Sequence, residues 1–250
     1  MKKINKKVNA TIIIIGNEIL SGRTQDVNVM TLSKWLNESG IKVEEVRIIE
    51  DSEKSIVNTI NEVKKKFKYV FTTGGIGPTH DDITSQSIAK AFNFSYGYNK
   101  EAYQTLEKYY GKEKFNEGRK KMAKMPDKAS LIYNPSSGAP GFIVENVYCL
   151  PGVPSILKSM LDGLKNKISG GKKILSKTIS VNTVESEIAK SLENIQNKFK
   201  NIEIGSYPFF RMGKVGISIV VRSTEQKLID DCSKEIVNFM KKNKIKITER

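Results

Sequence analysis

One stretch of the sequence decides the fold: Thr72-Thr73-Gly74-Gly75-Ile76-Gly77-Pro78-Thr79-His80-Asp81-Asp82-Ile83-Thr84. It follows an apolar segment, 69–73, that is typical of a buried strand, and it opens a helical segment, 83–92. Its three glycines allow a tight turn that directs several backbone N–H groups towards one point. The start of the following helix adds unpaired donors and the positive end of a dipole. The stretch therefore predicts a cradle for a phosphate group on an α/β protein.

Two adjacent acids, Asp81 and Asp82, end this loop. Bare carboxylates repel an anion, so they make sense beside a phosphate if a divalent cation such as Mg²⁺ lies between them. Asp82 or Thr84 could equally cap the helix, and both interpretations stay open. His80, the only histidine, is interpreted as a loop residue that could touch a ligand. The loop lacks the Lys of a Walker motif and the glycine spacing of a dinucleotide fingerprint, which disfavours a kinase or a dehydrogenase.

Strand and helix signals alternate on both sides of this loop. Strands are expected at 11–15, 43–49 and 69–73, and helices at 28–38, 52–67 and 83–92, with Ser52 as a helix cap. This order predicts parallel strands covered by helices, which is a doubly wound sheet. Such sheets bind ligands beyond the carboxyl ends of their strands.

The turn after the first strand, 16–28, should therefore lie near the glycine-rich loop. Glu18 and Asn28 could contact a sugar or a ring, or serve only as turn and cap residues. Asp51, after the second strand, could reach the same rim or cap the helix that it precedes.

Beyond residue 92 the pattern becomes less regular. Residues 100–125 predict one or two helices, two proline-containing turns lie at 134–141 and 150–154, and one strand, 142–148, lies between them. A helix at 155–164 and a linker at 169–173 follow. The remaining pattern, strand, helix, two strands and helix, predicts a small α+β domain. The expected domains are 1–170 and 171–250.

Composition agrees with a globular protein of 250 residues, 38% of them hydrophobic and 28% charged. The apolar run after the basic start is too short for a signal peptide, so a cytoplasmic protein with reduced cysteines is expected. The formal charge of +15 suits anionic ligands. A nucleic-acid-binding module is the weaker alternative, because the basic residues are not interleaved with aromatic ones and the second domain has no Gly-x-x-Gly clamp.

Together these motifs resemble the molybdopterin-binding fold of the MoaB/Mog proteins and the CinA-like competence/damage-inducible proteins. The doubled Asp after Gly77-Pro78-Thr79 favours the CinA-like branch, as do the segments 16–22, 138–141 and 150–154. In the second domain, 185–189 and 205–208 are similar to that branch too. The resemblance implies a MoaB/Mog-like, mostly parallel sheet with helices on both faces, plus the small C-terminal α+β domain.

The resemblance also implies a function. Mog-type relatives adenylylate molybdopterin or insert molybdate with acids that match Asp51 and Asp82, and CinA-like domains are associated with metal-dependent hydrolysis of ADP-ribose and related nucleotide pyrophosphates. The chain is thus expected to bind a nucleotide or pterin and to act as an ADP-ribose pyrophosphatase with Mg²⁺ or another divalent cation. A non-catalytic molybdopterin-binding protein is the alternative. Nothing in the chain matches the deamidase domain of full-length CinA proteins, so deamidase activity is not expected.

From these turns and the resemblance, the expected catalytic residues are Asp51, Asp81 and Asp82, and the expected metal ligands are Asp82 and Asp81. The expected ligand-binding residues are Gly16, Glu18, Ser21, Gly22, Asn28, Thr73, Gly74, Gly75, Gly77, Pro78, Thr79, Thr84, Ser137, Gly138, Pro140, Gly141, Pro151, Gly152 and Pro154. A homo-oligomer is also expected from the resemblance. The chain departs from the family where Ser155-Ile156 replaces an acid and a methionine.

Overall fold

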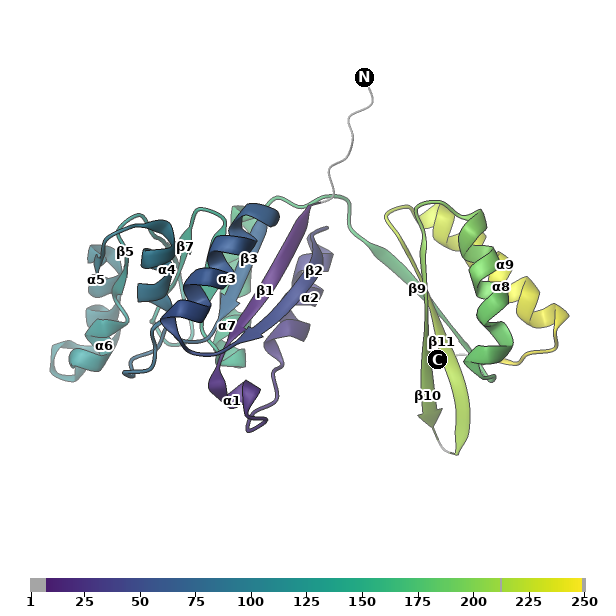
Figure 1. Cartoon of the computed structure of the whole chain (residues 1–250), viewed down its shortest axis with the longest axis horizontal. Coiled ribbons are helices and arrows are strands. Elements are labelled where there is room, and N and C mark those ends of the chain that lie inside the picture. Colours follow the sequence, from purple (N-terminus) through teal and green to yellow (C-terminus); the bar gives the residue numbers. More distant parts are fainter. Residues whose placement is uncertain (1–7, 212, 249–250) are drawn as a thin grey trace, which may run out of the picture. The chain divides into compact units, whose positions relative to one another are not determined.

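The computed structural model describes residues 8–211 and 213–248. The chain divides into two compact units, one ending at Gly171 and the other beginning at Lys172 (Figure 1). The basic residues that precede Val8 lie outside the described residues. No described helix is both long enough and apolar enough to cross a bilayer.

A six-stranded sheet forms the centre of the first unit. Its order is β2 (Lys42–Ile49), β1 (Asn9–Ile15), β3 (Tyr69–Thr73), β8 (Val147–Leu150), β7 (Gly141–Val144) and β6 (Ser130–Ile132). The four strands from β2 to β8 run parallel, while β7 and β6 are each antiparallel to their neighbours. The predicted mostly parallel sheet is confirmed.

Helices cover both faces of this sheet (Figure 1). On one face α2 (Asn28–Glu38) and α7 (Pro154–Leu164) pack on Ile12 and Ile14 of β1. On the other, α3 (Glu53–Lys66), α4 (Thr84–Phe92) and α5 (Lys100–Tyr110) pack around Ile13 and Ile15. All four of these isoleucines are buried, because successive side chains of a central strand point to opposite, equally covered faces.

The predicted single strand at 142–148 is wrong, because this segment is the hairpin of β7 and β8. Its turn consists of Glu145, in the left-handed region at φ 51°, and Asn146. The Asn146 amide donates to the carbonyls of Lys64 and Phe67 at 3.0 and 2.9 Å, which anchors the turn to the end of α3. The hairpin brings both its free ends, Gly141 and Leu150, to the edge where β3 ends.

The segment between α4 and β6 is an insertion at the side of the sheet. Besides α5 it contains a short 3₁₀ turn (Lys112–Lys114), α6 (Glu117–Lys121) and a two-stranded sheet of β4 (Tyr96–Tyr98) and β5 (Lys124–Pro126). The helices agree with the prediction, whereas the small sheet was not predicted. Its strands have three residues each, too few to show a period in the sequence.

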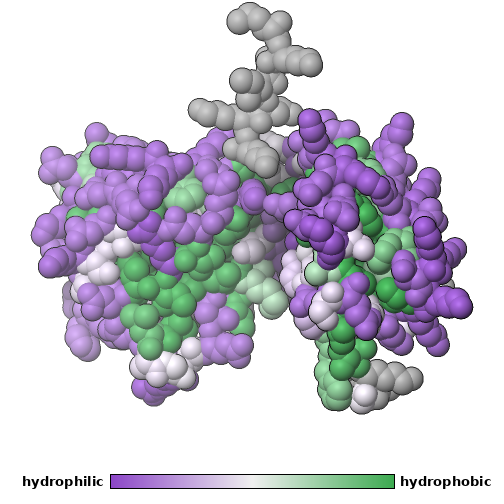
Figure 2. Space-filling model, turned by 45° about the vertical axis from the view of Figure 1, so that its right-hand side comes forward, coloured by the Kyte–Doolittle hydropathy of each residue, from purple (hydrophilic) through white to green (hydrophobic). Residues whose placement is uncertain are grey.

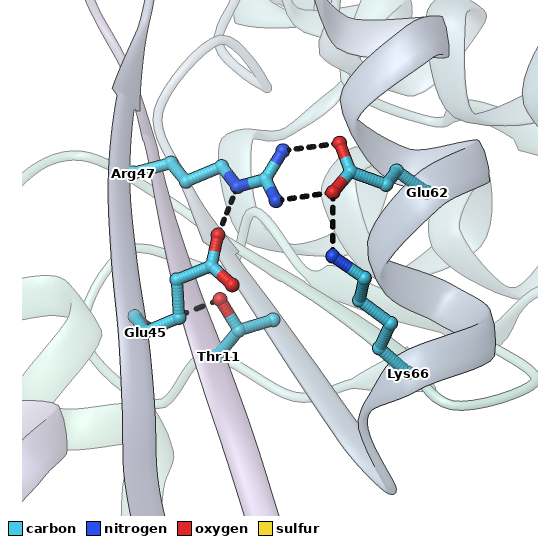
Figure 3. Close-up of polar contacts among 5 residues, drawn as sticks. All are labelled: Thr11, Glu45, Arg47, Glu62 and Lys66. Atoms are coloured by element: carbon cyan, nitrogen blue, oxygen red, sulfur yellow. Dashed lines mark hydrogen bonds and ion pairs between the residues drawn. The ribbon is translucent and has the colours of Figure 1, made fainter.

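A charged network joins the edge strand β2 to α3 (Figure 3). Arg47 donates through its two terminal nitrogens to Glu62, at 2.7 Å each, and its Nε contacts Glu45. Lys66 also donates to Glu62 at 2.7 Å. Arg47 and Lys66 lower the pKa of Glu62 to about 2, chiefly through the Arg47–Glu62 hydrogen bonds. The carboxylates of Glu62 and Glu45 in turn raise the pKa of Arg47.

The second unit is the predicted small α+β domain. Its sheet has the order β10 (Glu203–Arg211), β11 (Lys214–Ser223), β9 (Leu175–Val181) and β12 (Ile247–Thr248), and every neighbouring pair is antiparallel. Helices α8 (Glu185–Lys198) and α9 (Gln226–Lys242) pack on one side of the sheet. Ser206 donates to Glu185 at 2.6 Å, so two segments that carry the resemblance meet here. A 3₁₀ turn (Lys165–Lys167) and residues up to Gly171 precede this unit.

Candidate functional site

Five connecting segments meet at one edge of the six-stranded sheet, because parallel strands end on the same side. Three of them follow β1, β2 and β3, and a fourth follows β8. The fifth precedes β7, which runs the opposite way and so begins where β8 ends. Hydrogen bonds tie neighbouring segments together: the Gly16 amide donates to Ile49 O at 3.2 Å, and the Gly74 amide donates to Leu150 O at 3.1 Å.

The glycine-rich loop is held in a conformation that only glycine fits. Gly74 has φ 100°, and a Cβ atom there would lie 2.2 Å from the backbone oxygen of Ile15. Gly75 has φ 67°, and its Cβ would lie 2.2 Å from the hydroxyl oxygen of Thr84. That hydroxyl donates to Gly74 O at 3.0 Å, and the Thr84 amide donates to Gly75 O at 2.9 Å. The loop is therefore closed onto the start of α4 by its own backbone.

Asp82 does not cap α4. Its Oδ2 accepts from the Thr79 amide at 2.8 Å and from the Thr79 hydroxyl at 2.6 Å, so it closes the turn 79–82 instead. The N-cap of α4 is Ile83, and no side chain bonds to the first-turn amides there. The Thr79 side chain, backbone hydrogen bonding, His80 and Lys121 lower the pKa of Asp81. Of the two open interpretations, helix capping is excluded for Asp82.

Asp51 links the ends of β1 and β2. Its Oδ2 accepts from the Asn17 amide at 2.7 Å, and the Asp51 amide donates back to Asn17 Oδ1 at 3.3 Å. Ser52, as predicted, caps α3 by accepting from the Ser55 amide at 3.2 Å. Asp51 is therefore free of the capping role. Desolvation is the main cause that raises its pKa, and the charges of Glu18, Asp81 and Asp82 raise it further, against the hydrogen bond from Asn17.

Asn28 joins the first turn to the segment after β8. It is 4% exposed, and its Nδ2 donates to Gly152 O at 2.7 Å. Asp26, rather than Asn28, accepts from the first turn of α2, at Val29 N. Within the described part of the chain, Asn28 Oδ1 and the hydroxyl of Thr73 are buried without a hydrogen-bond partner. Buried polar atoms normally have a partner, so a ligand at this edge could supply one for these two atoms. Among the described residues, Trp35 Nε1, Thr72 Oγ1 and Ser233 Oγ are buried without a partner as well, so the lack of a partner is not by itself the mark of a ligand.

Hydrogen bonds of Asn134 and packing on Tyr109 hold the loop before β7. Buried Asn134 accepts from the amides of Ser136 and Ser137 at 2.9 and 3.1 Å and donates to Ser137 Oγ and Ala139 O. A Cβ at Gly138, which has φ 72°, would lie 2.5 Å from the ring of Tyr109 in α5. The predicted residues Ser137 and Gly138 are thus fixed between the insertion and the sheet edge, and Pro140 and Gly141 lead from them into β7.

The other predicted residues lie on the same connections. Gly16 and Glu18 are in contact, since a Cβ at Gly16 would lie 2.7 Å from the Glu18 carboxylate. A Cβ at Gly77 would lie 2.7 Å from the carboxylate of Asp82. Pro151 follows β8, and Pro154 is the first residue of α7. Ser21 and Gly22 are less well connected: they lie just beyond α1 (Asn17–Leu20), exposed, with Ser21 bonded to Glu18 O.

Lys121 is a functional candidate that the sequence did not indicate. Its Nζ donates to Thr79 O, and its charge contributes to lowering the pKa of Asp81. The insertion also packs on the loop through Gly118, where a Cβ would lie 3.4 Å from Pro78 O. Lys121 reaches the site from a separate helix 42 residues away, so no local pattern marks it.

The acids at this edge do not form a metal site by themselves. Glu18, Asp81 and Asp82 lie close enough to Asp51 to act on it electrostatically. Among the described residues, however, no three or more His, Cys, Asp or Glu side chains are grouped so that they could hold a metal ion. Asp82 Oδ2 and Asp51 Oδ2 are already occupied by backbone donors. The geometry thus does not support the predicted cation held by Asp81 and Asp82 alone.

Each of the two units matches a known domain family. Residues 11–170 match the probable molybdopterin binding domain, and residues 173–249 match the middle domain of FAD synthase. A protein of Archaeoglobus fulgidus is 34% identical over 79% of this chain and 84% of its own length. A CinA-like protein of Prochlorococcus marinus is 30% identical over 86% of this chain but only 53% of its own length. The crystal structure of CinA from Thermoplasma acidophilum, described as of unknown function, superposes with a TM-score of 0.61 and 32% identity, over 65% of this chain and 98% of the other.

Proposed function

Because this chain belongs to the CinA-like family of proteins with a probable molybdopterin binding domain, we propose that it binds a phosphate-bearing nucleotide or pterin at the edge defined by Gly74–Gly77 and hydrolyses a nucleotide pyrophosphate there. One observation carries the proposal: the closed loop with two left-handed glycines lies beside the unpartnered, buried atoms of Asn28 and Thr73. Rigid backbone amides suit a phosphate, and the two buried side chains suit the polar part of a ring or sugar.

The reaction would be attack of water on one phosphorus of the pyrophosphate. For ADP-ribose, the bridging P–O bond breaks, its electron pair leaves with ribose 5-phosphate, and the other product is AMP. Asp51 is the best candidate to take the proton of the attacking water, because its raised pKa makes it a stronger base than an ordinary aspartate. The loop amides and Lys121 would hold the phosphates in place.

A divalent cation would enter as part of the substrate, since Mg²⁺ is commonly bound by one or two carboxylates together with substrate phosphates. It would offset negative charge on the phosphates beside Asp81 and Asp82. This arrangement requires no group of protein ligands that is complete before the substrate binds.

The test is release of AMP by the purified chain with Mg²⁺, Co²⁺ or EDTA. ADP-ribose is the first substrate, and FAD is the second because the second unit matches a FAD synthase domain. Metal-dependent AMP release supports the hydrolase. Binding without release under any metal would instead support the alternative, a non-catalytic molybdopterin-binding protein, which the occupied Asp51 and Asp82 oxygens favour.

Lys121→Ala is expected to weaken ADP-ribose binding roughly tenfold, because one charge-assisted contact is lost near the phosphates. Lys121→Arg should retain most of the affinity. Lys120→Ala is the matched control, since Lys120 is ion-paired with Glu117 at 2.7 Å. Isothermal titration calorimetry at constant salt measures the dissociation constants of ADP-ribose for the wild type and the three variants. Equal affinities for Lys121→Ala and Lys120→Ala would remove Lys121 from the site.

A further inference from the structure

The two ends of the ligand edge, where the five connecting segments meet, expose different kinds of apolar side chains. Near β1 and β2 they are aliphatic, with Leu20 54% and Val27 38% exposed. Figure 2 shows hydrophobic residues gathered on this side of the first unit. At the other end lies the insertion (Figure 1), where Tyr109 of α5 is 53% exposed. A base stacks on the flat face of a ring, so the insertion end is where the edge offers a stacking surface.

The Tyr109 ring is held in place by three contacts. It lies on Gly138, since a Cβ added there would lie 2.5 Å from the ring. Its hydroxyl donates to Ser136 O at 3.4 Å. The Tyr110 ring meets it at 87° with the centroids 5.0 Å apart, and Arg119 in turn lies over the Tyr110 ring at 4.1 Å. Because Gly138 covers one face of Tyr109, the exposed part of this ring is its other face and its edge.

The loop that carries Gly138 belongs to the same edge as the glycine-rich loop. Ile132 at the end of β6 pairs with Gly141 at the start of β7, so the loop joins these strands where β8 ends. In the strand order, β7 is two places from β3. Neighbouring strands lie about 4.8 Å apart, so the two loops start roughly 10 Å from each other. A nucleotide can bridge such a distance between its phosphate and its base.

The insertion contacts the edge at both of these loops. In the glycine-rich loop, Lys121 Nζ donates to Thr79 O. In the loop before β7, the Tyr109 ring packs on Gly138. One folded segment thus holds a cation and an aromatic ring at two points of the edge, with the end of β8 between them. A cation suits a phosphate, and a ring suits a base.

We propose that Tyr109 stacks on the base of the bound nucleotide while the phosphates lie on Gly74–Gly77. This inference rests on the proposed function, because it requires the phosphates at that loop. Rings bind bases through their faces with little regard to base identity, and a tyrosine that is already held loses little freedom on binding. The substrate class is then a nucleotide with a planar base, and a sugar phosphate without a base is bound more weakly.

Tyr98 offers a matched control. It is 51% exposed, which is close to the exposure of Tyr109. However, it lies in β4, on the small sheet of the insertion. Lys124 lies over its ring at 4.8 Å, and the Tyr103 ring meets it edge-on. Removing the Tyr98 ring therefore costs a comparable exposed surface without touching the loop before β7.

Titration of the ¹⁵N-labelled full chain with AMP and with ribose 5-phosphate, both with Mg²⁺, tests the proposal. The two ligands differ by the base alone, and neither contains the pyrophosphate that the chain would hydrolyse. Tyr109→Ala should weaken AMP binding about 5- to 150-fold and leave the affinity for ribose 5-phosphate unchanged. Tyr109→Phe, which keeps the ring, and Tyr98→Ala should bind both ligands as the wild type does. The spectra also show whether each variant is folded.

Each other outcome is decisive. Equal AMP affinities for the wild type and Tyr109→Ala would overturn the inference and leave the proposed function untouched. Equal losses of both ligands in Tyr109→Ala would also overturn it, because the ring would then support the loop rather than the base. So would a loss of AMP affinity in Tyr98→Ala as large as in Tyr109→Ala. A wild type that binds neither ligand would overturn the proposed function, and this inference with it.

A second substitution moves the ring without removing it. Gly138→Ala places a Cβ 2.5 Å from the Tyr109 ring, so it should weaken AMP binding in the wild type and have little further effect in Tyr109→Ala. Gly213→Ala is the control, since Gly213 has a similar φ of 73° and nothing within 4 Å of an added Cβ. It should bind AMP normally. The same loss from Gly138→Ala with and without the ring would show that the loop, and not Tyr109, contacts the base.

Discussion

Asp51→Asn is expected to lower kcat/KM for ADP-ribose by about 10²–10⁴-fold and to remove the acid limb of the pH profile. An amide cannot take a proton from water. The fold should survive, because the substituted side chain keeps an oxygen that can accept from the Asn17 amide, and partial burial disfavours the charge that is removed. The affinity for ADP-ribose should change far less than turnover.

The sign of the pH dependence follows from the environment of Asp51. Desolvation and the neighbouring acids raise its pKa above the ordinary value of 3.8. The base is active when ionised, so wild-type activity should fall as the pH drops through this raised pKa, at a higher pH than for an ordinary aspartate. Asp162→Asn is the control, because Asp162 is exposed and ion-paired with Lys165 at 2.8 Å. A wild-type acid limb that persists in Asp51→Asn would assign the proton transfer to another group.

Gly74→Ala is expected to abolish measurable ligand binding and to destabilise the protein. Alanine at φ 100° costs roughly 1–3 kcal/mol of backbone strain. The added Cβ also overlaps the backbone oxygen of Ile15 at 2.2 Å, and a central strand cannot move away as a flexible side chain could. The loop must shift, and a displacement of about 1 Å is enough to cost 10²-fold in a positioned site.

Thermal unfolding and calorimetry with ADP-ribose measure the two effects. Gly163→Ala is the matched control: a Cβ there meets nothing within 4 Å, and the residue lies in α7. It should stabilise the protein by about 0.5–1 kcal/mol, because alanine is the better helix former, and leave binding unchanged. Wild-type affinity in a folded Gly74→Ala variant would show that the loop conformation is not needed for the ligand.

The parts of the fold that sequence could predict are those that repeat locally. Isoleucines at 12–15 and the apolar positions of α2 and α3 follow the strand and helix periods, and Ser52 and the glycines mark the ends of elements. The hairpin at 145–146 was missed because Glu145 adopts φ 51° without the glycine that usually signals such a turn. The apolar residues on both sides of Glu145-Asn146 then resembled one strand.

In the candidate site, too, some features follow from local sequence and others depend on the tertiary fold. The convergence of the loops after β1, β2 and β3 follows from the strand order, so Asp51 and Gly74 could be placed on one edge from sequence. The roles of the individual residues could not be predicted from the sequence. Whether Asp82 caps α4 or closes the turn with Thr79 depends on where the folded loop places its carboxylate. Lys121 joins the loop only because the whole insertion folds against Pro78, which is a tertiary contact.

The charge distribution suits a metal-bound phosphate better than a bare one. The chain has a formal charge of +15, yet the site edge holds Glu18, Asp51, Asp81 and Asp82. The overall charge raises the local concentration of anions, while the acids select ligands that carry their own counter-ion. This is why the proposed substrate is a nucleotide diphosphate together with its cation.

The location of the ligand is the central claim, and nuclear magnetic resonance of the ¹⁵N-labelled full chain tests it most directly. ADP-ribose is titrated with Mg²⁺ into the Asp51→Asn variant, so that the cation is present and turnover does not interfere. The largest amide shift changes should fall on Gly74, Gly75 and Gly77, with smaller ones at Asn28 and Gly152 across the same edge. Unchanged loop amides, with the main changes on the β10–β11 hairpin of the second unit, would contradict the site.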